Sequence, residues 1–209
     1  DELKAEGFQG IFVGSGAGLP NFMDIPGENA LNIMSSNEYL TRVNLMDAAN
    51  PSTDTPINLG KKVLVVGGGN TAMDSCRTAK RLGADVTLVY RRSEAEMPAR
   101  IEEVKHAKEE GIKFLTLHNP KEYLTDENGA VKAAVLDVMQ LGEPDQSGRR
   151  RPETTGETIT IECDQVIVAV GVSPNPLVPK SIEGLALGRK NTIAVNDQMQ
   201  SSRKEIYAG

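Results

Sequence analysis

The sequence predicts an α/β fold with a doubly wound parallel sheet and an antiparallel β-meander, arranged in three layers. Residues 63–66 form a run of four branched apolar residues, typical of a parallel strand covered on both faces. A glycine turn and a helix-period stripe follow, and a second strand pattern comes within about thirty residues. Later strand patterns, separated by Asn-Gly and Pro/Ser/Gly turns, indicate the meander.

Before the glycine turn, the sequence predicts a strand over residues 10–13 and a helix over residues 38–49. Small residues, glycines among them, follow this strand and give a second, weaker indication of a glycine turn. On the helix, Leu40 and Val43 are expected to face inward, with Leu45 and Met46 as further candidates. A polar linker then leads into the main unit.

The residues after the apolar strand have the spacing Gly-x-Gly-x-x-Ala. Gly67 allows the sharp turn, Gly69 lets a pyrophosphate reach the backbone, and the small Ala72 lets the helix pack closely on the strand. Free amides at the helix start would face the anion. The pattern therefore indicates a Rossmann-like dinucleotide site; the alternative is a turn that serves only the fold. The predicted phosphate-binding residues are Gly67, Gly68, Gly69, Asn70, Thr71, Ala72 and Asp74.

The helix after this turn is predicted over residues 70–82, and Gly83 is well placed to end it. Its buried stripe consists of Ala72, Cys76, Ala79 and Leu82. The second strand, around residues 86–90, completes a strand-helix-strand unit of the length expected for a nucleotide-binding half.

Two arginines, Arg91 and Arg92, close the second strand, where an NAD site normally places a carboxylate against the ribose hydroxyls. Their guanidinium groups can clamp a 2′-phosphate, and no Asp or Glu stands at that strand end to repel it. One such contact is worth roughly 1.5–3 kcal/mol, which favours the phosphorylated cofactor about tenfold to a hundredfold. We therefore predict NADPH rather than NADH; the alternative is a solvated arginine pair.

After the second strand, a helix ending near residue 110 is expected to turn Ile101, Val104 and Ala107 inward. A third strand covers residues 112–117. The meander strands are expected within residues 122–125, 131–141 and 158–161, with Arg149, Arg150 and Arg151 as a solvated charge run at an exposed hairpin tip.

A last buried strand, residues 165–171, returns the chain to the parallel sheet. Because ligands of open α/β sheets lie outside the carboxyl ends of the strands, we expect its end to lie near the same crevice. The residues concerned are Ala169, Val170, Gly171 and Val172.

The composition excludes several other functions. The 209 residues carry a net charge of −6, which argues against a nucleic-acid partner. No apolar run approaches the roughly twenty residues needed to cross a bilayer, and no signal-peptide pattern begins the chain, so we expect a cytoplasmic protein without a membrane partner. Cys76 and Cys163 are 87 positions apart, and His106 and His118 have no neighbours at metal spacing. We predict no metal and no catalytic side chain.

Four motifs resemble the NADPH domain of the glutamate synthase small subunit and of related FAD- and NAD(P)-dependent pyridine nucleotide oxidoreductases. They are Gly-Gly-Gly-Asn-Thr-Ala-Met-Asp, Val-Tyr-Arg-Arg-Ser, Glu-Met-Pro-Ala-Arg and Ala-Val-Gly-Val-Ser-Pro-Asn-Pro. The resemblance covers nearly the entire chain. It implies an isolated NADPH domain with remnants of an FAD domain, because the FAD glycine fingerprint and the iron–sulfur cysteines of the family are missing. We expect residues 1–56 to hold the end of an FAD-type domain and a linker helix, and residues 57–175 to form the NADPH domain. Residues 176–209 are expected to be a truncated return segment toward the FAD domain.

Carried over by position, the resemblance places the pyrophosphate on the glycine turn, the 2′-phosphate on the arginine pair, and the nicotinamide side on the backbone of residues 169–172. Arg100 is a further candidate for the adenosine end. The implied mechanism is hydride transfer from bound NADPH to FAD, with no acid or base supplied by this chain. In the intact protein, electrons would pass through iron–sulfur centres to a glutamate synthase large subunit.

Two alternatives remain open. A ferredoxin:NADP oxidoreductase of the electron-bifurcating type would use the same domain in its large subunit, with a ferredoxin-linked subunit as partner. A non-enzymatic NADPH-sensing module is the second alternative. Thioredoxin reductase has a similar fold, but its dithiol would lie in this domain, and the sequence has no such pair.

Overall fold

The computed structural model describes residues 2–209, which form two compact units. The larger unit is Pro20–Gly171, and the smaller combines the N-terminal residues through Leu19 with Val172–Gly209. Residues 20–56, expected to hold the end of an FAD-type domain and a linker helix, contribute a strand and a helix to the larger unit. The assignment of FAD remnants stays a prediction.

A five-stranded parallel sheet forms the centre of the larger unit, in the order β3-β10-β4-β5-β6. Residues 63–66 of the central strand are all buried, as their continuous apolar pattern predicts. The strands are β3 (Ile33–Ser35), β4 (Lys62–Val66), β5 (Asp85–Tyr90), β6 (Lys113–Thr116) and β10 (Gln165–Val168). The predicted parallel α/β sheet is confirmed.

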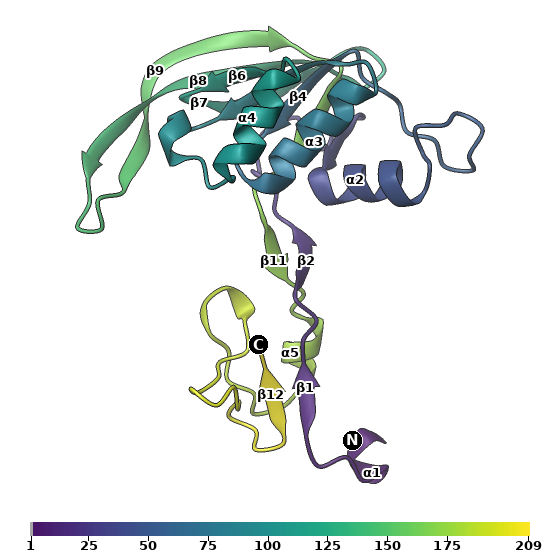
Figure 1. The fold of residues 1–209 in the computed structure, drawn as a ribbon, viewed down its shortest axis with the longest axis vertical. Coiled ribbons are helices and arrows are strands. Elements are labelled where there is room, and N and C mark those ends of the chain that lie inside the picture. Colours follow the sequence, from purple (N-terminus) through teal and green to yellow (C-terminus); the bar gives the residue numbers. More distant parts are fainter. Residues whose placement is uncertain (1) are drawn as a thin grey trace. The chain divides into compact units, whose positions relative to one another are not determined.

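Three helices cover one face of this sheet (Figure 1). They are α2 (Ser36–Leu45), α3 (Asn70–Arg81) and α4 (Ile101–Glu109). Ala72, Cys76 and Ala79 are buried on α3, as its predicted stripe requires, and Met73 is buried beside them. Burial raises the pKa of the Cys76 thiol far above its usual range, so this cysteine is an unreactive packing residue.

Two predictions about helix ends were wrong. Helix α2 starts at Ser36 because the Ser35 side chain accepts a hydrogen bond from the Glu38 amide (3.2 Å), and it ends at Leu45 rather than residue 49. Leu45 and Met46 are therefore exposed, by 81% and 47%, instead of facing inward.

The predicted inward face is also wrong at the first residue of α4. Ile101, expected to face inward, is the first residue of the helix and is 83% exposed. Val104 and Ala107, one and two turns on, contact the core as predicted. Leu82, expected on the buried stripe of α3, lies just after that helix and is 38% exposed.

A three-stranded antiparallel meander covers the other face of the sheet, so the unit has three layers. It consists of β7 (His118–Thr125), β8 (Val131–Pro144) and β9 (Arg150–Glu162). Tyr123, Ala134 and Leu136 pack against sheet residues such as Leu64 and Val166. The strands are longer than expected, and the β8–β9 hairpin extends well past the sheet (Figure 1).

The arginine run lies at the tip of this hairpin, as predicted, but Arg150 is not simply solvated. The turn spans residues 145–149, where Asp145 accepts hydrogen bonds from Ser147 and Arg149. The Arg150 guanidinium donates to the carbonyls of Gly142 (2.9 Å) and Leu141 (3.0 Å) across the hairpin. Two main-chain contacts thus hold one cation of the run in place.

The smaller unit has short elements only. Strand β1 (Ile11–Val13), at the predicted position, pairs in parallel with β12 (Ile206–Ala208), and β2 (Ala17–Pro20) pairs with β11 (Val172–Pro174). The helices are α1 (Glu2–Ala5), α5 (Leu177–Ser181) and the 3₁₀ helix η2 (Arg189–Asn191).

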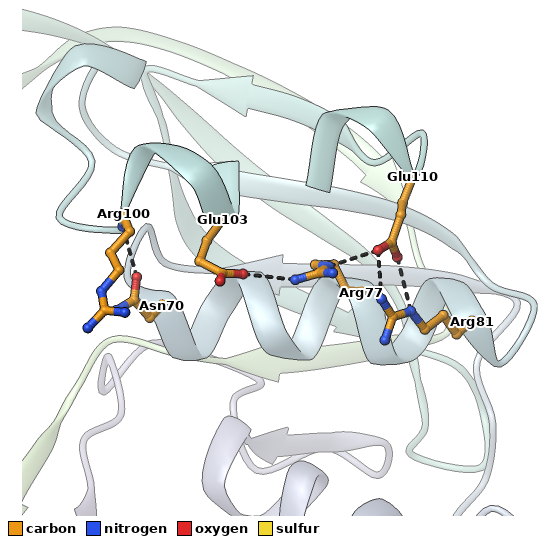
Figure 2. A network of polar contacts seen from close by, with 6 residues as sticks. All are labelled: Asn70, Arg77, Arg81, Arg100, Glu103 and Glu110. Carbon is orange, nitrogen blue, oxygen red and sulfur yellow. Dashed lines mark hydrogen bonds and ion pairs between the residues drawn. The ribbon is translucent and has the colours of Figure 1, made fainter. Parts of the chain in front are cut away.

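An ion-pair network joins α3 to α4 (Figure 2). Arg77 donates to Glu103 (2.8 Å) and Glu110 (2.9 Å), and Arg81 donates to Glu110 (2.8 Å). Hydrogen bonds from Arg81, followed by those from Arg77, hold the pKa of Glu110 below its usual value. The ionised carboxylate of Glu110 therefore stabilises the contact between the two helices.

We expect Glu110→Gln to lower the thermal unfolding midpoint at pH 7, with a deficit that shrinks on acidification. A carboxyl whose pKa is depressed by folding adds stability above its unfolded value, near 4.5, and that stability is lost as the pH falls through the folded pKa. Thermal melts between pH 7 and pH 3 measure this. Glu109→Gln, an exposed residue 3.7 Å from Lys105, is the matched control. A deficit independent of pH would contradict the role given to the charge.

Candidate dinucleotide site

Three segments meet at the carboxyl ends of the central strands. The Gly67 amide donates to the Val89 carbonyl (3.0 Å), and the Ala169 amide donates to the Val66 carbonyl (2.8 Å). The Ala99 amide donates to the Gly68 carbonyl (3.1 Å). The structure therefore brings the glycine turn together with two other predicted segments, the loop after β5 and the residues after β10.

The first two glycines are required by the fold of the chain itself. Gly67 has φ +139°, and a Cβ there would lie 2.3 Å from the Ala169 carbonyl oxygen. At Gly68, a Cβ would lie 2.7 Å from the ring of Tyr90. Both positions are thus explained without any ligand.

Gly69 differs from its neighbours. Its backbone is in an extended conformation that any residue adopts, and no atom lies within 4 Å of the place a Cβ would take. It is the N-cap residue of α3, and no side chain caps that helix end. Open space thus lies in front of first-turn amides that the helix itself cannot satisfy. A pyrophosphate fits this cradle in charge and in its need for close backbone approach.

The other predicted residues of α3 have different surroundings. The Asn70 side chain accepts a hydrogen bond from the Arg100 amide (2.9 Å), which holds the start of α4 against the start of α3 (Figure 2). Ala72 is buried against the sheet. Thr71 and Asp74 are exposed, and their contact with a nucleotide stays a prediction.

The two arginines after β5 are not equivalent. Arg91 is exposed, and within residues 2–209 its side chain has no hydrogen bond or ion pair. Arg92 is 14% exposed, with Nη2 3.8 Å from Glu96 Oε1, and its Nε is buried without a described partner. Arg91 is therefore the more available cation for a 2′-phosphate. The side chain of Arg100 is also exposed.

Two residues near these arginines were missed in the sequence. The first is Glu96, the last residue of the 3₁₀ helix η1 (Glu94–Glu96), whose carboxylate lies beside Ser93. Its Oε2 accepts hydrogen bonds from the Ser93 amide (3.0 Å) and hydroxyl (2.6 Å). The Ser-x-x-Glu spacing is a capping-box signal that could have revealed this contact. The second is Tyr90, whose hydroxyl donates to the Glu96 carbonyl (2.8 Å).

The residues after β10 form the remaining edge of the site. Ala169 approaches Gly67, Val170 is 39% exposed, and Gly171 has φ +103°. The Gly171 carbonyl accepts a hydrogen bond from the Asn21 amide (3.0 Å). Val172 begins β11 in the smaller unit, so its place at the site stays a prediction.

The described residues offer little support for metal or thiol chemistry. No group of three or more His, Cys, Asp or Glu side chains suited to a metal ion occurs within residues 2–209. Cys163 is buried, and burial raises its pKa to about 12. In the same range, no helix is both long and apolar enough to cross a membrane.

The fold and the glycine turn define an FAD/NAD(P)-binding type of α/β domain. Residues 3–209 match the pyridine nucleotide-disulphide oxidoreductase family, and the chain belongs to it. The family description itself names a pyridine nucleotide, in agreement with the predicted dinucleotide site.

Two relatives are similar in sequence. The beta subunit of the NADPH-Fe(3+) oxidoreductase of Geobacter sulfurreducens is 40% identical over 196 residues, 92% of this chain and 28% of that protein. The small chain of the NADPH glutamate synthase of Halomonas elongata is 33% identical over 217 residues, 100% of this chain and 45% of that protein. This chain thus spans less than half the length of both relatives.

The solved structures support the same fold. Mycobacterium tuberculosis FprA in complex with NADPH superposes with a TM-score of 0.79 at 18% identity, over 99% of this chain and 58% of that one. At this identity the likeness shows the fold alone.

The contrast between Gly67 and Gly69 gives a stability test. We expect Gly67→Ala to destabilise the protein by about 1–3 kcal/mol, because a side chain at positive φ would also collide with the Ala169 carbonyl. Gly69→Ala should change the free energy of unfolding by less than about 0.5 kcal/mol, because its Cβ meets open space. Urea unfolding of both variants measures this, and equal losses would contradict the distinction.

Proposed function

We propose that this chain is the NADPH-binding domain of a flavin-dependent oxidoreductase. The observation that carries the proposal is the open cradle at Gly69, where the fold requires no glycine and no side chain caps the first-turn amides of α3. The exposed Arg91 at the end of the neighbouring strand supports a 2′-phosphorylated cofactor. Membership in a pyridine nucleotide oxidoreductase family supports the same cofactor class.

The residues of this chain act by binding and orientation. The amides at the start of α3 hold the pyrophosphate, and Arg91 and Arg92 hold the 2′-phosphate. The backbone of residues 169–171, held beside Gly67, supports the nicotinamide half. Bound NADPH supplies a hydride for the flavin of the intact protein. We assign no acid, base or metal ligand to this chain.

For the intact protein, we propose a glutamate synthase type role, in which electrons leave the flavin through iron–sulfur centres to a large subunit. Support comes from the motifs and from the Halomonas relative, which matches over the full length of this chain. The Geobacter relative, at 40% identity, supports a second role with a different electron acceptor. The NADPH site serves both roles equally, because the acceptor binds elsewhere.

Calorimetric titration with NADPH and NADH, at fixed ionic strength, tests the cofactor. We expect the wild-type protein to bind NADPH about tenfold to a hundredfold more tightly, because the arginines contact only the 2′-phosphate. Arg91→Ala/Arg92→Ala should remove most of this preference and leave NADH binding nearly unchanged. Equal weakening of both cofactors would show that the 2′-phosphate lies elsewhere.

A glycine variant provides the matched control for the pyrophosphate. Gly69→Val fills the open space in front of the α3 amides and should weaken NADPH and NADH alike. Unchanged affinity for both would mean that the glycine turn serves only the fold.

The sensor alternative is tested with the flavin-loaded, full-length protein. An oxidoreductase transfers electrons from NADPH to an artificial dye, whereas a sensor binds NADPH without turnover. We expect dye reduction, and it should be lost in Gly69→Val at NADPH concentrations that saturate the wild type. Binding without dye reduction would favour the sensor.

A further inference from the structure

The arginine loop contains a carboxylate that the strand-end pattern does not predict. Glu96 Oε1 lies 3.8 Å from Arg92 Nη2, and the Glu96 and Arg92 side chains are 20% and 14% exposed. Glu96 Oε2 accepts from both the amide and the hydroxyl of Ser93. One carboxylate thus takes up two hydrogen-bond donors and faces a guanidinium.

The Ser93 donors and the Arg92 guanidinium are the kinds of group that bind a 2′-phosphate. A phosphate dianion binds to guanidinium groups, hydroxyls and backbone amides, and the loop after β5 is where the 2′-phosphate is expected. In this structure, the donors of Ser93 face Glu96 instead. The buried Nε of Arg92, without a described partner, shows that Glu96 does not satisfy this arginine in full.

We propose that Glu96 is a specificity-determining residue that competes, as an internal anion, with the 2′-phosphate for the donors of Ser93 and Arg92. This inference rests on the proposed NADPH site and adds a residue that weakens binding of the 2′-phosphate there. Glu96 therefore lowers the preference for the phosphorylated cofactor below what the two arginines alone would produce.

The electrostatic surroundings agree with this role. Hydrogen bonds from Ser93, and then the positive charges of Arg92 and Arg150, hold the pKa of Glu96 below its usual value against the effect of partial burial. The carboxylate is therefore ionised near neutral pH. A dianionic phosphate placed on the same donors would be repelled by it.

The alternative is that Glu96 has a structural role, and removing its charge would then have the opposite effect on phosphate binding. If Glu96 serves to position Arg92 and Ser93 for the phosphate, removing its charge weakens binding. The 3.8 Å separation from Arg92 exceeds a normal hydrogen bond, which argues against a tight positioning contact. The position of the loop is instead fixed by hydrogen bonds to main-chain carbonyls, from the Tyr90 hydroxyl to Glu96 and from the Ala99 amide to Gly68.

Glu96→Gln tests the inference, because the amide oxygen can still accept both Ser93 hydrogen bonds while the charge is removed. The ligands are adenosine 2′,5′-bisphosphate and adenosine 5′-monophosphate, which differ only in the 2′-phosphate. We expect the bisphosphate to bind roughly threefold to tenfold more tightly to the variant, the effect of one partly screened charge. Binding of the monophosphate should be unchanged, and added salt should reduce the gain.

Glu94→Gln is the matched control. It removes the same charge from the same short helix, but Glu94 pairs with Lys108 (2.5 Å) and is 46% exposed. Its affinity for the bisphosphate should stay within about twofold of the wild type. Thermal melts of both variants establish that the fold is retained.

Three outcomes overturn the inference. Weaker binding of the bisphosphate to Glu96→Gln would assign Glu96 a positioning role, and unchanged binding would assign it no role at the site. If neither the wild-type protein nor Glu96→Gln prefers the bisphosphate over the monophosphate, the proposed NADPH site fails as well. A wild-type preference that is lost in Arg91→Ala/Arg92→Ala but unchanged in Glu96→Gln rejects only the role of Glu96.

Discussion

The larger unit depends on one close contact between two backbones, at Gly67 and Ala169. A Cβ at position 67 would lie 2.3 Å from the Ala169 carbonyl oxygen, a separation that real Cβ atoms do not show. This contact lets β10 lie beside β4, although the two strands are about a hundred residues apart in the chain. On the other side, the Gly67 amide bonds to Val89 in β5. One glycine therefore joins the three strand ends on which both halves of a dinucleotide would rest.

Tyr90 has a comparable role for the loop after β5. Its ring lies against Gly68, and its hydroxyl bonds to the Glu96 carbonyl. The amides of Ala99 and Arg100 bond to Gly68 and Asn70, so the loop is tied to the glycine turn at three points. The spacing between the glycine turn, where we propose that the pyrophosphate binds, and the arginines is thus set by the fold of the chain itself. Such preorganisation reduces the entropy cost of binding.

The sequence predicted most of the larger unit, because its signals are local. The apolar run in β4, the glycine spacing and the buried stripe of α3 each specify an element without reference to the rest of the chain. The errors in predicted burial lie where a helix begins or ends. Leu45 and Ile101 fit a helical stripe but lie at the last and first positions of their helices, where one face is no longer packed. The cap contact at Ser35, which decides one such boundary, depends on geometry that periodicity does not record.

The same limit applies to the candidate site. The motif assigns Gly67 to the turn and Gly69 to the pyrophosphate, but only the structure shows the contacts behind this difference. A Cβ at Gly67 would meet the Ala169 carbonyl, whereas one at Gly69 would meet open space. Similarly, the strand end at Arg91 and Arg92 contains no acidic residue, but η1 returns the Glu96 carboxylate to it. A short turn can thus change the charge balance of a site without changing the motif that marks it.

The meander contributes to this arrangement as well as covering the sheet. The Leu117 amide bonds to the Arg92 carbonyl, and the Leu117 carbonyl accepts from the Met139 amide in β8. The arginine loop is therefore held by the glycine turn through Tyr90 and by the meander through Leu117. Because Arg150 at the start of β9 contributes to the lowered pKa of Glu96, the hairpin also adds positive charge near this loop. Positive charge near this loop thus comes from two layers of the unit, so a chain with net charge −6 can still be locally positive at the proposed anion site.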